Sequence, residues 1–224
     1  MNYSLIRSKR KTVTIYVRED CVEVRAPLHM PKYMIDRFVT SKEKWIEDKQ
    51  SRLIEQAKKR EGFRLDYGSL LTYRGGQYPV AAKEGVRAGF DGARFYMPAG
   101  LSPERIKAAC VQIYRLLAKR DLTERARLFA QQMSVTPAAI RITGARTRWG
   151  SCSARKSISF SWYLMMAGDD LIDYVVVHEL AHIAELNHSD RFWAIVAGAI
   201  PDWRERRAKL KELQRKLSGE DWEA

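Results

Sequence analysis

His178-Glu179-Leu180-Ala181-His182, with His188 six residues further on, is the stretch from which the fold and chemistry of this chain can be predicted. Positions four apart lie on one face of an α-helix, so His178 and His182 point the same way, with Glu179 beside them. Two imidazoles on one face can hold a zinc ion, and a neighbouring carboxylate can take a proton from water there. Three of the four histidines in the chain lie within residues 178–188, which distinguishes the motif from a chance match.

The residues before the motif indicate that its helix is buried. Leu171 to Val177 is apolar on almost every side, with Asp173 as the charged exception. Buried histidines need polar partners or a metal, and we favour the metal over a hydrogen-bonded core pair. Asn187 tolerates the left-handed conformation that ends many helices, so we expect the helix to stop there and a turn to return His188.

A hydrolytic zinc site needs a third protein ligand and one open position. His188 is favoured, because it lies beyond the turn and can approach from another direction. Glu185 follows His182 on the same expected helix, where three successive ligands have poor tetrahedral geometry. Asp202 and Glu205 lie further along the chain and are the distant alternatives.

Glu179 is the expected catalytic residue, taking a proton from water and passing it to the leaving group, although a purely orienting role is the alternative. Arg148, Tyr163 and Tyr174 are candidates for contacts to the substrate or the transition state. No glycine cluster has the spacing of a phosphate loop, so zinc is the one cofactor that the sequence indicates.

The composition is that of a globular protein, with 224 residues, 46% of them hydrophobic and 30% charged. A net charge of +13 favours anionic partners, although a solvated basic surface is an equal alternative. Cys21, Cys110 and Cys152 are far apart, which argues against a disulfide framework and for a reducing compartment. There is no secretory signal pattern and no apolar run of about 18 residues, so we expect a cytoplasmic protein with no membrane contact.

Hydrophobic periodicity predicts an α+β fold with small antiparallel sheets. The front half contains, in order, a β-hairpin (12–17 and 22–26), a long helix opened by Pro31 (to about residue 60), and an antiparallel sheet (62–100) with a type I′ turn at Asp91-Gly92. The back half contains a helix capped by Ser102 (103–133), a strand (140–143), an alternating strand (157–164), the metal helix, a helix capped by Ser189, and a basic amphipathic helix (203–217). We expect one domain over 1–224, with a β-rich part (1–100) and a helical zinc-binding core (101–224).

Four segments resemble a known family. Arg148-Trp149-Gly150-Ser151-Cys152-Ser153, an alternating strand, the His178–His182 motif and Asn187-His188-Ser189-x-x-Phe192-Trp193 are similar to the YgjP-type metallopeptidases. These are related to the wider zincins, which include the SprT and WLM groups. The resemblance implies a zincin fold with an edge strand beside the cleft, zinc on His178, His182 and His188, and Glu179 as the catalytic residue. It does not imply a particular substrate.

Three functions compete at this point. The first is a zinc-dependent peptidase, in which the alternating strand ending near Tyr163 pairs with an extended peptide. The second is a zinc- or magnesium-dependent pyrophosphohydrolase of nucleoside triphosphates, since arginine suits phosphate oxygens. The cations that motivate it precede the metal helix: Arg141, Arg146, Arg148, Arg155 and Lys156. The third is a DNA-associated protease or nucleic-acid binder, which no nucleic-acid-binding motif supports.

Overall fold

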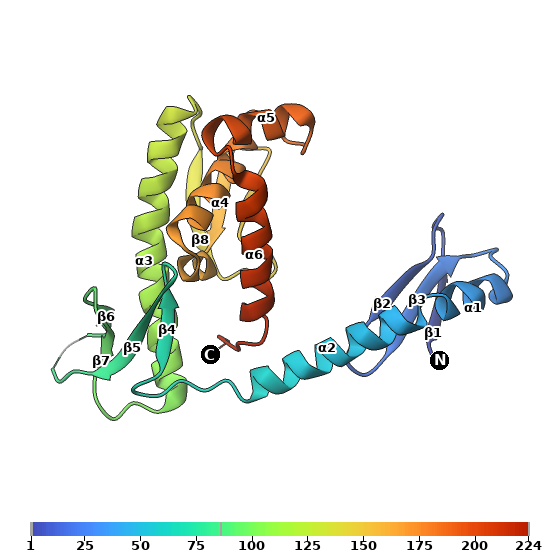
Figure 1. The fold of residues 1–224 in the computed structure, drawn as a ribbon, viewed down its shortest axis with the longest axis horizontal. Helices are drawn as coiled ribbons and strands as arrows, with labels where there is room; N and C mark the ends of the chain where they lie inside the picture. The colour runs from blue at the N-terminus through green and yellow to red at the C-terminus, as the bar shows by residue number, and fades with distance from the viewer. Residues whose placement is uncertain (1, 86, 224) are drawn as a thin grey trace. The chain divides into compact units, whose positions relative to one another are not determined.

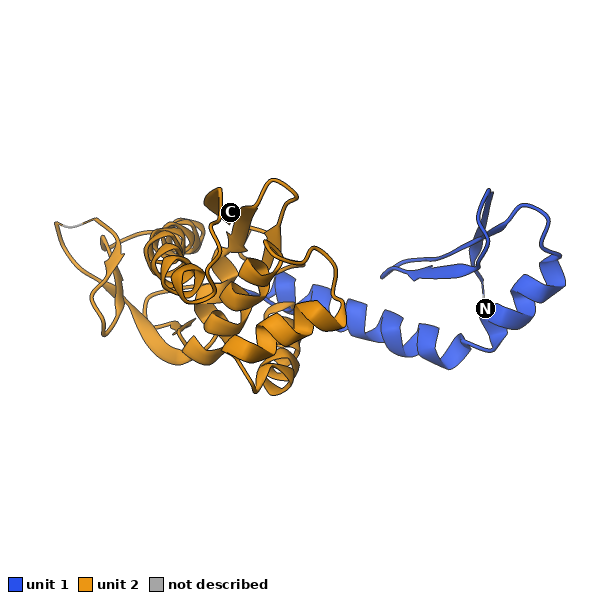
Figure 2. Cartoon of the chain, turned by 90° about the horizontal axis from the view of Figure 1, so that it is seen from above, with its two compact units in different colours: residues 1–63, 219–221 blue, residues 64–218, 222–224 orange. Residues whose placement is uncertain are grey.

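The structure is a computed structural model that describes residues 2–85 and 87–223 (Figure 1). The chain divides into two compact units, residues 1–63 with 219–221 and residues 64–218 with 222–224 (Figure 2). The described residues form six α-helices, one 3-10 helix and three small sheets, which is the α+β class predicted. Each sheet also contains one parallel pair of strands, whereas purely antiparallel sheets were predicted. One domain over the whole chain stays a prediction.

The first unit contains the predicted hairpin, β2 (Thr14–Val17) and β3 (Val22–Pro27), and an additional strand β1 (Ser4–Ser8) parallel to β3. The predicted long helix is two helices, α1 (Lys32–Thr40) and α2 (Glu43–Glu61). At the break the Ser41 hydroxyl donates to the carbonyl of Phe38. Apolar residues of both helices pack in one core with the strands: Val17, Val22, Val24, Ala26, Ile35, Val39 and Ile46.

The second unit begins with a four-stranded sheet in the order β4-β5-β7-β6. Its strands are β4 (Leu70–Tyr73), β5 (Gly76–Ala82), β6 (Gly89–Phe90) and β7 (Phe95–Met97). The type I′ conformation predicted at Asp91-Gly92 is wrong, because only Gly92 has a positive φ there. Arg74-Gly75, between β4 and β5, has φ of 49° and 79°, the signs that a type I′ turn requires.

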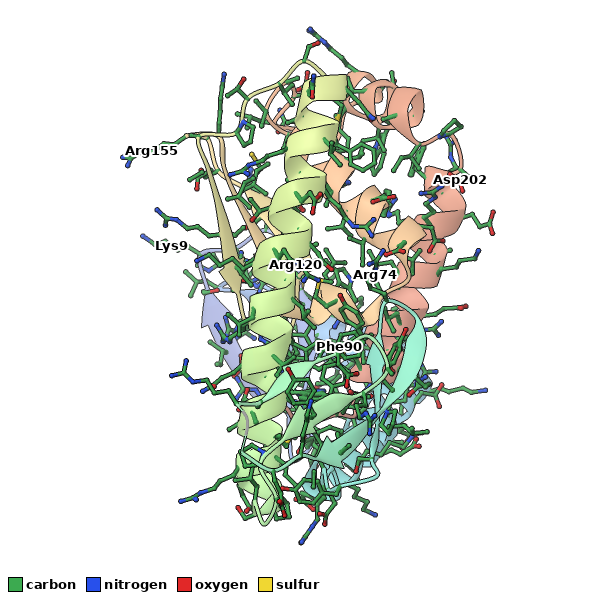
Figure 3. All side chains as sticks on the ribbon, turned by 90° about the vertical axis from the view of Figure 1, so that its left-hand side faces the viewer. Lys9, Arg74, Phe90, Arg120, Arg155 and Asp202 are labelled. Atoms are coloured by element: carbon green, nitrogen blue, oxygen red, sulfur yellow. The ribbon has the colours of Figure 1, made fainter. Side chains whose placement is uncertain are left out.

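Arg74 can hold this left-handed conformation because three hydrogen bonds restrain it. Its backbone N–H donates to the carbonyl of Met165 at 2.8 Å. Its guanidinium forms two 2.6 Å hydrogen bonds to Asp169, which also binds Arg125 (Figure 3 labels Arg74). The turn is therefore fixed to Asp169, the first residue of the helix that contains His178.

A second sheet has the order β8-β10-β9, made of β8 (Ala139–Thr143), β9 (Gly150–Cys152) and β10 (Ser157–Ser161). The predicted strand through Leu164 is wrong beyond Ser161, because Trp162–Met166 is a buried 3-10 helix, η1. The Ser161 side chain caps it by accepting from the N–H of Tyr163. β10 is the middle strand, so the prediction that it is the peptide-binding edge strand is also wrong; β9 is an edge.

Four helices complete the second unit: α3 (Pro103–Gln132), α4 (Asp169–Ala181), α5 (Asp190–Ala199) and α6 (Trp203–Leu217). The caps predicted at Ser102 and Ser189 are confirmed. α4 lies between α3 and α6 (Figure 1) and also contacts α5 and β9. Among the described residues, no helix is both long and apolar enough to cross a membrane.

Candidate metal centre and active site

α4 positions the motif, and it is buried as predicted. Its buried residues surround the axis, from Leu171 through Tyr174 to Ala181. The helix ends at Ala181 rather than Asn187, with His182 as its C-cap and a turn over residues 183–184. Two acidic residues, Asp169 and Asp170, lie in its first turn, where the helix dipole favours negative charge.

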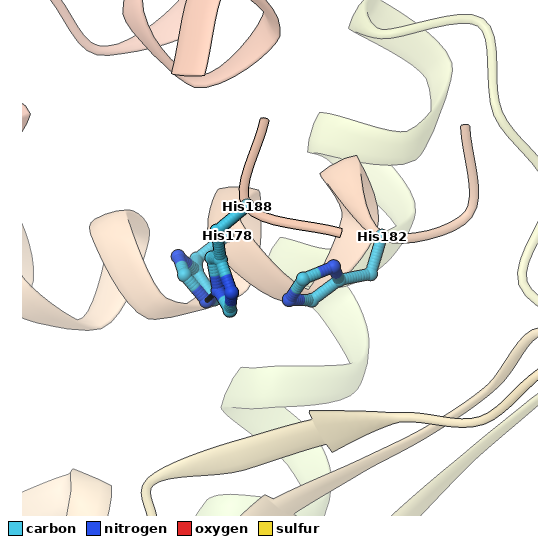
Figure 4. Close-up of side chains that lie close together, drawn as sticks. All are labelled: His178, His182 and His188. Carbon is cyan, nitrogen blue, oxygen red and sulfur yellow. Dashed lines mark hydrogen bonds between the residues drawn. The ribbon is translucent and has the colours of Figure 1, made fainter. Parts of the chain in front are cut away.

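The three predicted zinc ligands lie together (Figure 4). One nitrogen from each of His178, His182 and His188 lies within 4.8 Å of the other two. The Nε2 atoms of His178 and His188 are 3.2 Å apart. Two nitrogens at about 2.0–2.1 Å from a tetrahedral zinc ion are separated by about 3.3 Å. The distance between these two nitrogens therefore fits a metal ion with nitrogen ligands.

Neighbouring groups orient the rings. Nδ1 of His182 lies 3.1 Å from the carbonyl of Glu185, which can only accept, so Nδ1 carries the proton and Nε2 is free. Nδ1 of His178 is buried with no hydrogen-bond partner. Burial lowers the pKa of His178 to about 3, with smaller contributions from the charges of His182, His188 and Arg207. His178 is therefore neutral at pH 7, the form that binds metal.

Two aromatic residues of α5 support the cluster. The ring of Phe192 is fully buried, and its centroid lies 4.9, 4.5 and 4.8 Å from those of His178, His182 and His188. Trp193 stacks on His188 at 5.6 Å and on Trp203 of α6 at 4.0 Å. Packing of α5 against α6 thus holds the ring of His188, which lies on the loop before α5.

Glu179 is 6% exposed and lies in one pocket with His178 and His188. Burial raises the pKa of its carboxyl to about 8, and the positive charge of Arg148 opposes this rise. Arg148 is the one charged group among the described residues that favours the ionised form of Glu179.

Glu179, His178 and His188 line one pocket of about 420 Å³. α4 supplies one wall, β9 and the loop before it supply a second, and α6 supplies a third. The remaining lining residues are Thr147, Trp149, Gly150, Tyr174, Val175, Arg207, Leu210, Lys211 and Gln214.

The three predicted contact residues have different positions. Tyr174 lines the pocket, with its ring centroid 5.9 Å from that of His178. Arg148 is exposed and acts on Glu179 through its charge, but is not part of the lining. Tyr163 is buried in η1, stacked on Trp162 at 3.9 Å, and does not line the pocket.

The alternative third ligands are not in the histidine cluster. Asp202 binds Arg206 at 2.9 Å, and Glu205 binds Lys209 at 2.8 Å, both within α6. Glu185 contributes its backbone carbonyl to His182. Figure 3 shows Asp202 at the outer surface of the unit.

None of the five cations predicted to contact phosphate lines the pocket. Arg146 pairs with Glu223 at 3.1 Å. Arg155 is exposed and points away from the unit (Figure 3). The cations in the pocket wall are Arg207 and Lys211, which sequence reasoning missed.

A signal for these two residues was present. The cations of α6 that form ion pairs have an acidic residue three or four positions before them, as Lys209 has Glu205. Neither Arg207 nor Lys211 has an acidic residue at those spacings. A cation without an acidic neighbour on its own helix indicates a helix face that contacts another part of the protein or a ligand.

Comparison with known proteins identifies a matching protein family. A family model described as YgjP-like, metallopeptidase domain, matches residues 11–213. Two solved structures are similar to 42% of this chain and 96% of theirs: the metallopeptidase zymogens abylysin of Pyrococcus abyssi (20% identity, TM-score 0.39) and jannalysin of Methanocaldococcus jannaschii (19% identity, TM-score 0.38). No curated protein matches the chain. The family match spans most of the sequence, and family membership rests on this match alone.

Proposed function

The chain belongs to the YgjP-like metallopeptidase family, and on this basis we propose that it hydrolyses peptide bonds at a zinc ion held by His178, His182 and His188. The observation that carries the proposal is the convergence of three imidazoles, two of which line one pocket with the buried carboxyl group of Glu179. Zinc in such a site acts as a Lewis acid and lowers the pKa of water.

Glu179 takes the proton of the attacking water and delivers it to the amine that leaves. Its position on α4, one residue after the ligand His178, brings the carboxylate to the pocket on the side of β9. The surrounding apolar packing keeps bulk water away from the carboxyl, which suits a group that holds a proton between two steps.

Tyr174 and Arg148 provide positive or hydrogen-bonding groups for the oxyanion. The Tyr174 side chain lines the pocket one helical turn before His178, so its hydroxyl is the nearer candidate. Arg148 lies close enough to Glu179 to act on its pKa, and its role is to stabilise negative charge at the mouth of the site.

The substrate binds as an extended strand along β9. Among the described strands, β9 pairs with β10 alone, so one edge of its backbone is open to a further strand. β9 also contacts α4, and Gly150 of β9 lies beside Glu179. This strand replaces β10 in the original hypothesis.

Hydrolysis of nucleoside triphosphates is the second candidate, and the cations Arg207 and Lys211 in the pocket wall are the observation that favours it. The third hypothesis, a DNA-associated protease, and a cytoplasmic location stay predictions from composition.

One screen separates the first two candidates. Zinc-loaded protein is incubated with casein, with peptide libraries and with nucleoside triphosphates, and Glu179→Gln serves as the control. We expect peptide cleavage that the substitution lowers by about 100-fold or more while zinc content is unchanged. Triphosphate turnover that depends on Glu179, without peptide cleavage, would overturn the peptidase proposal.

A further inference from the structure

Two cations of α6 face the pocket from the wall opposite the sheet. Arg207 and Lys211 are four residues apart, so they lie on one helix face, and Gln214 continues that face by one turn. All three line the pocket, together with Leu210. The polar face of α6 is therefore part of the site that contains Glu179.

These two cations differ from three others on the same helix. Arg206 pairs with Asp202, the N-cap of α6, at 2.9 Å, and Lys209 and Arg215 pair with carboxylates of α6 at 2.8 and 3.7 Å. In the part of the chain that the structure describes, Arg207 and Lys211 have no carboxylate within ion-pair distance. The two cations of α6 that line the pocket are therefore available to another anion.

Arg207 lies beside the metal centre. Its guanidinium carbon is 5.4 Å from the centroid of Trp193, and Trp193 stacks on His188. Lys211 is one turn further from this point, about 6 Å along the helix axis. An anion held by both would lie close to the reacting bond.

The pocket lining contains little negative charge that could compete with a substrate anion for Arg207 and Lys211. Glu179 is the one acidic residue of its lining. A metal ion on the histidines adds positive charge, so an anionic group is attracted into the site and a cationic group is repelled.

We propose that Arg207 and Lys211 determine specificity by binding a carboxylate of the substrate within about two residues of the scissile bond, the reach that one helical turn spans along an extended chain. The carboxylate belongs to an Asp or Glu side chain or to the C-terminus of the peptide. This inference rests on the proposed peptidase function.

The test uses a zinc-loaded protein and a positional library of octapeptides in which each position is Glu or Gln and the C-terminus is an acid or an amide. We expect kcat/KM to be about 10-fold or more higher for peptides with the carboxylate at one position next to the cleaved bond. A preference for Glu over Gln identifies a side chain, and a preference for the acid over the amide identifies the C-terminus.

Arg207→Gln combined with Lys211→Gln removes the preference, and Arg207→Glu combined with Lys211→Glu reverses it toward Lys. Lys209→Gln is the matched control, because it removes one positive charge from the same helix at a residue paired with Glu205 outside the pocket. Melting temperature and zinc content show that each variant is folded and loaded.

Binding of the same peptides to zinc-loaded Glu179→Gln protein separates this inference from the proposed function. Peptide binding or cleavage without discrimination between Glu and Gln, or between acid and amide, overturns the inference and leaves the peptidase proposal intact. Preferential binding without cleavage by the parent protein supports the carboxylate site and contradicts the peptidase proposal. Triphosphate binding that depends on Arg207 and exceeds binding of every peptide overturns the choice of a carboxylate.

Discussion

Gly150 lies against the carboxylate of Glu179 so closely that a Cβ atom on residue 150 would come within 2.6 Å of Oε1. The φ angle of Gly150 is not positive, so space rather than backbone conformation accounts for the glycine. β9 therefore approaches α4 closely at Gly150, and the side-chain orientation of Glu179 depends on a residue of the sheet.

Gly150→Ala is expected to displace the Glu179 carboxylate and lower kcat by about 10- to 100-fold, because a misplacement of about 1 Å is costly in catalysis. Zinc content should be unchanged, since residue 150 contacts Glu179 and not the histidines. Activity and bound metal are measured together. Gly198→Ala is the matched control, because nothing lies within 4 Å of its added Cβ. Equal activity of both variants would contradict the role of Gly150.

His188→Ala is expected to weaken zinc binding by more than about 100-fold, because a ligand is lost and not only a supporting contact. Competition with a chromophoric chelator measures the affinity. His29→Ala removes the remaining histidine, an exposed residue of the first unit, and should leave affinity unchanged. If His188→Ala binds zinc like the parent protein, the third ligand lies elsewhere.

Asp169→Asn is expected to lower the free energy of unfolding by about 1 kcal/mol at pH 7, a small value because the side chain is half exposed. The hydrogen bond from Arg74 is the main cause that lowers the pKa of Asp169, and Arg125 adds to it. A carboxyl with a lowered pKa stabilises the fold above its unfolded value of about 3.9, and this stability is lost as pH falls through the folded pKa.

The difference between Asp169→Asn and the parent protein should therefore shrink below about pH 4. Urea unfolding at a series of pH values measures it. Glu124→Gln, at an exposed position of α3, provides the comparison within the same unit. A difference that grows on acidification would show that Asp169 does not stabilise the fold in its charged form.

Trp222→Ala is expected to lower the free energy of unfolding of the second unit by about 3 kcal/mol, because it empties a site in the core. Trp222 is buried and contacts the rings of Tyr114 and Trp162 edge-on, at 5.6 and 5.8 Å. Leu116→Ala, on the exposed face of α3, should change stability by less than about 0.5 kcal/mol. Similar losses in both variants would contradict this account.

Strong periodicity made much of the fold predictable. The helix over 203–217 has the bounds of α6, and the apolar run before His178 predicted the buried helix α4. The approach of His178 to His182 was predictable because spacing on a helix determines which side chains share a face, and that of His188 from the expected turn after the helix. Sequence patterns at these places agree with the packing that the structure adopts.

Three features depend on tertiary contacts and left little local signal. β9 has three residues, Gly150 to Cys152, too few to show alternation. η1 continues the apolar pattern of β10 because it is buried on all sides. α4 ends at Ala181 although helix-forming residues follow, and the next turn is tighter, with the N–H groups of Ile183 and Ala184 bonded to the carbonyls of Leu180 and Ala181.

This early helix end couples metal binding to the order of a loop. The segment 183–187 follows His182 and leads to His188, two members of the histidine cluster, and its own carbonyl at Glu185 contacts the ring of His182. Restraint of both rings restrains the loop between them, and by thermodynamic linkage the reverse also holds. Amide hydrogen exchange in residues 183–187 should slow on addition of zinc, and substitutions that raise the conformational entropy of this loop should weaken metal affinity without touching a ligand.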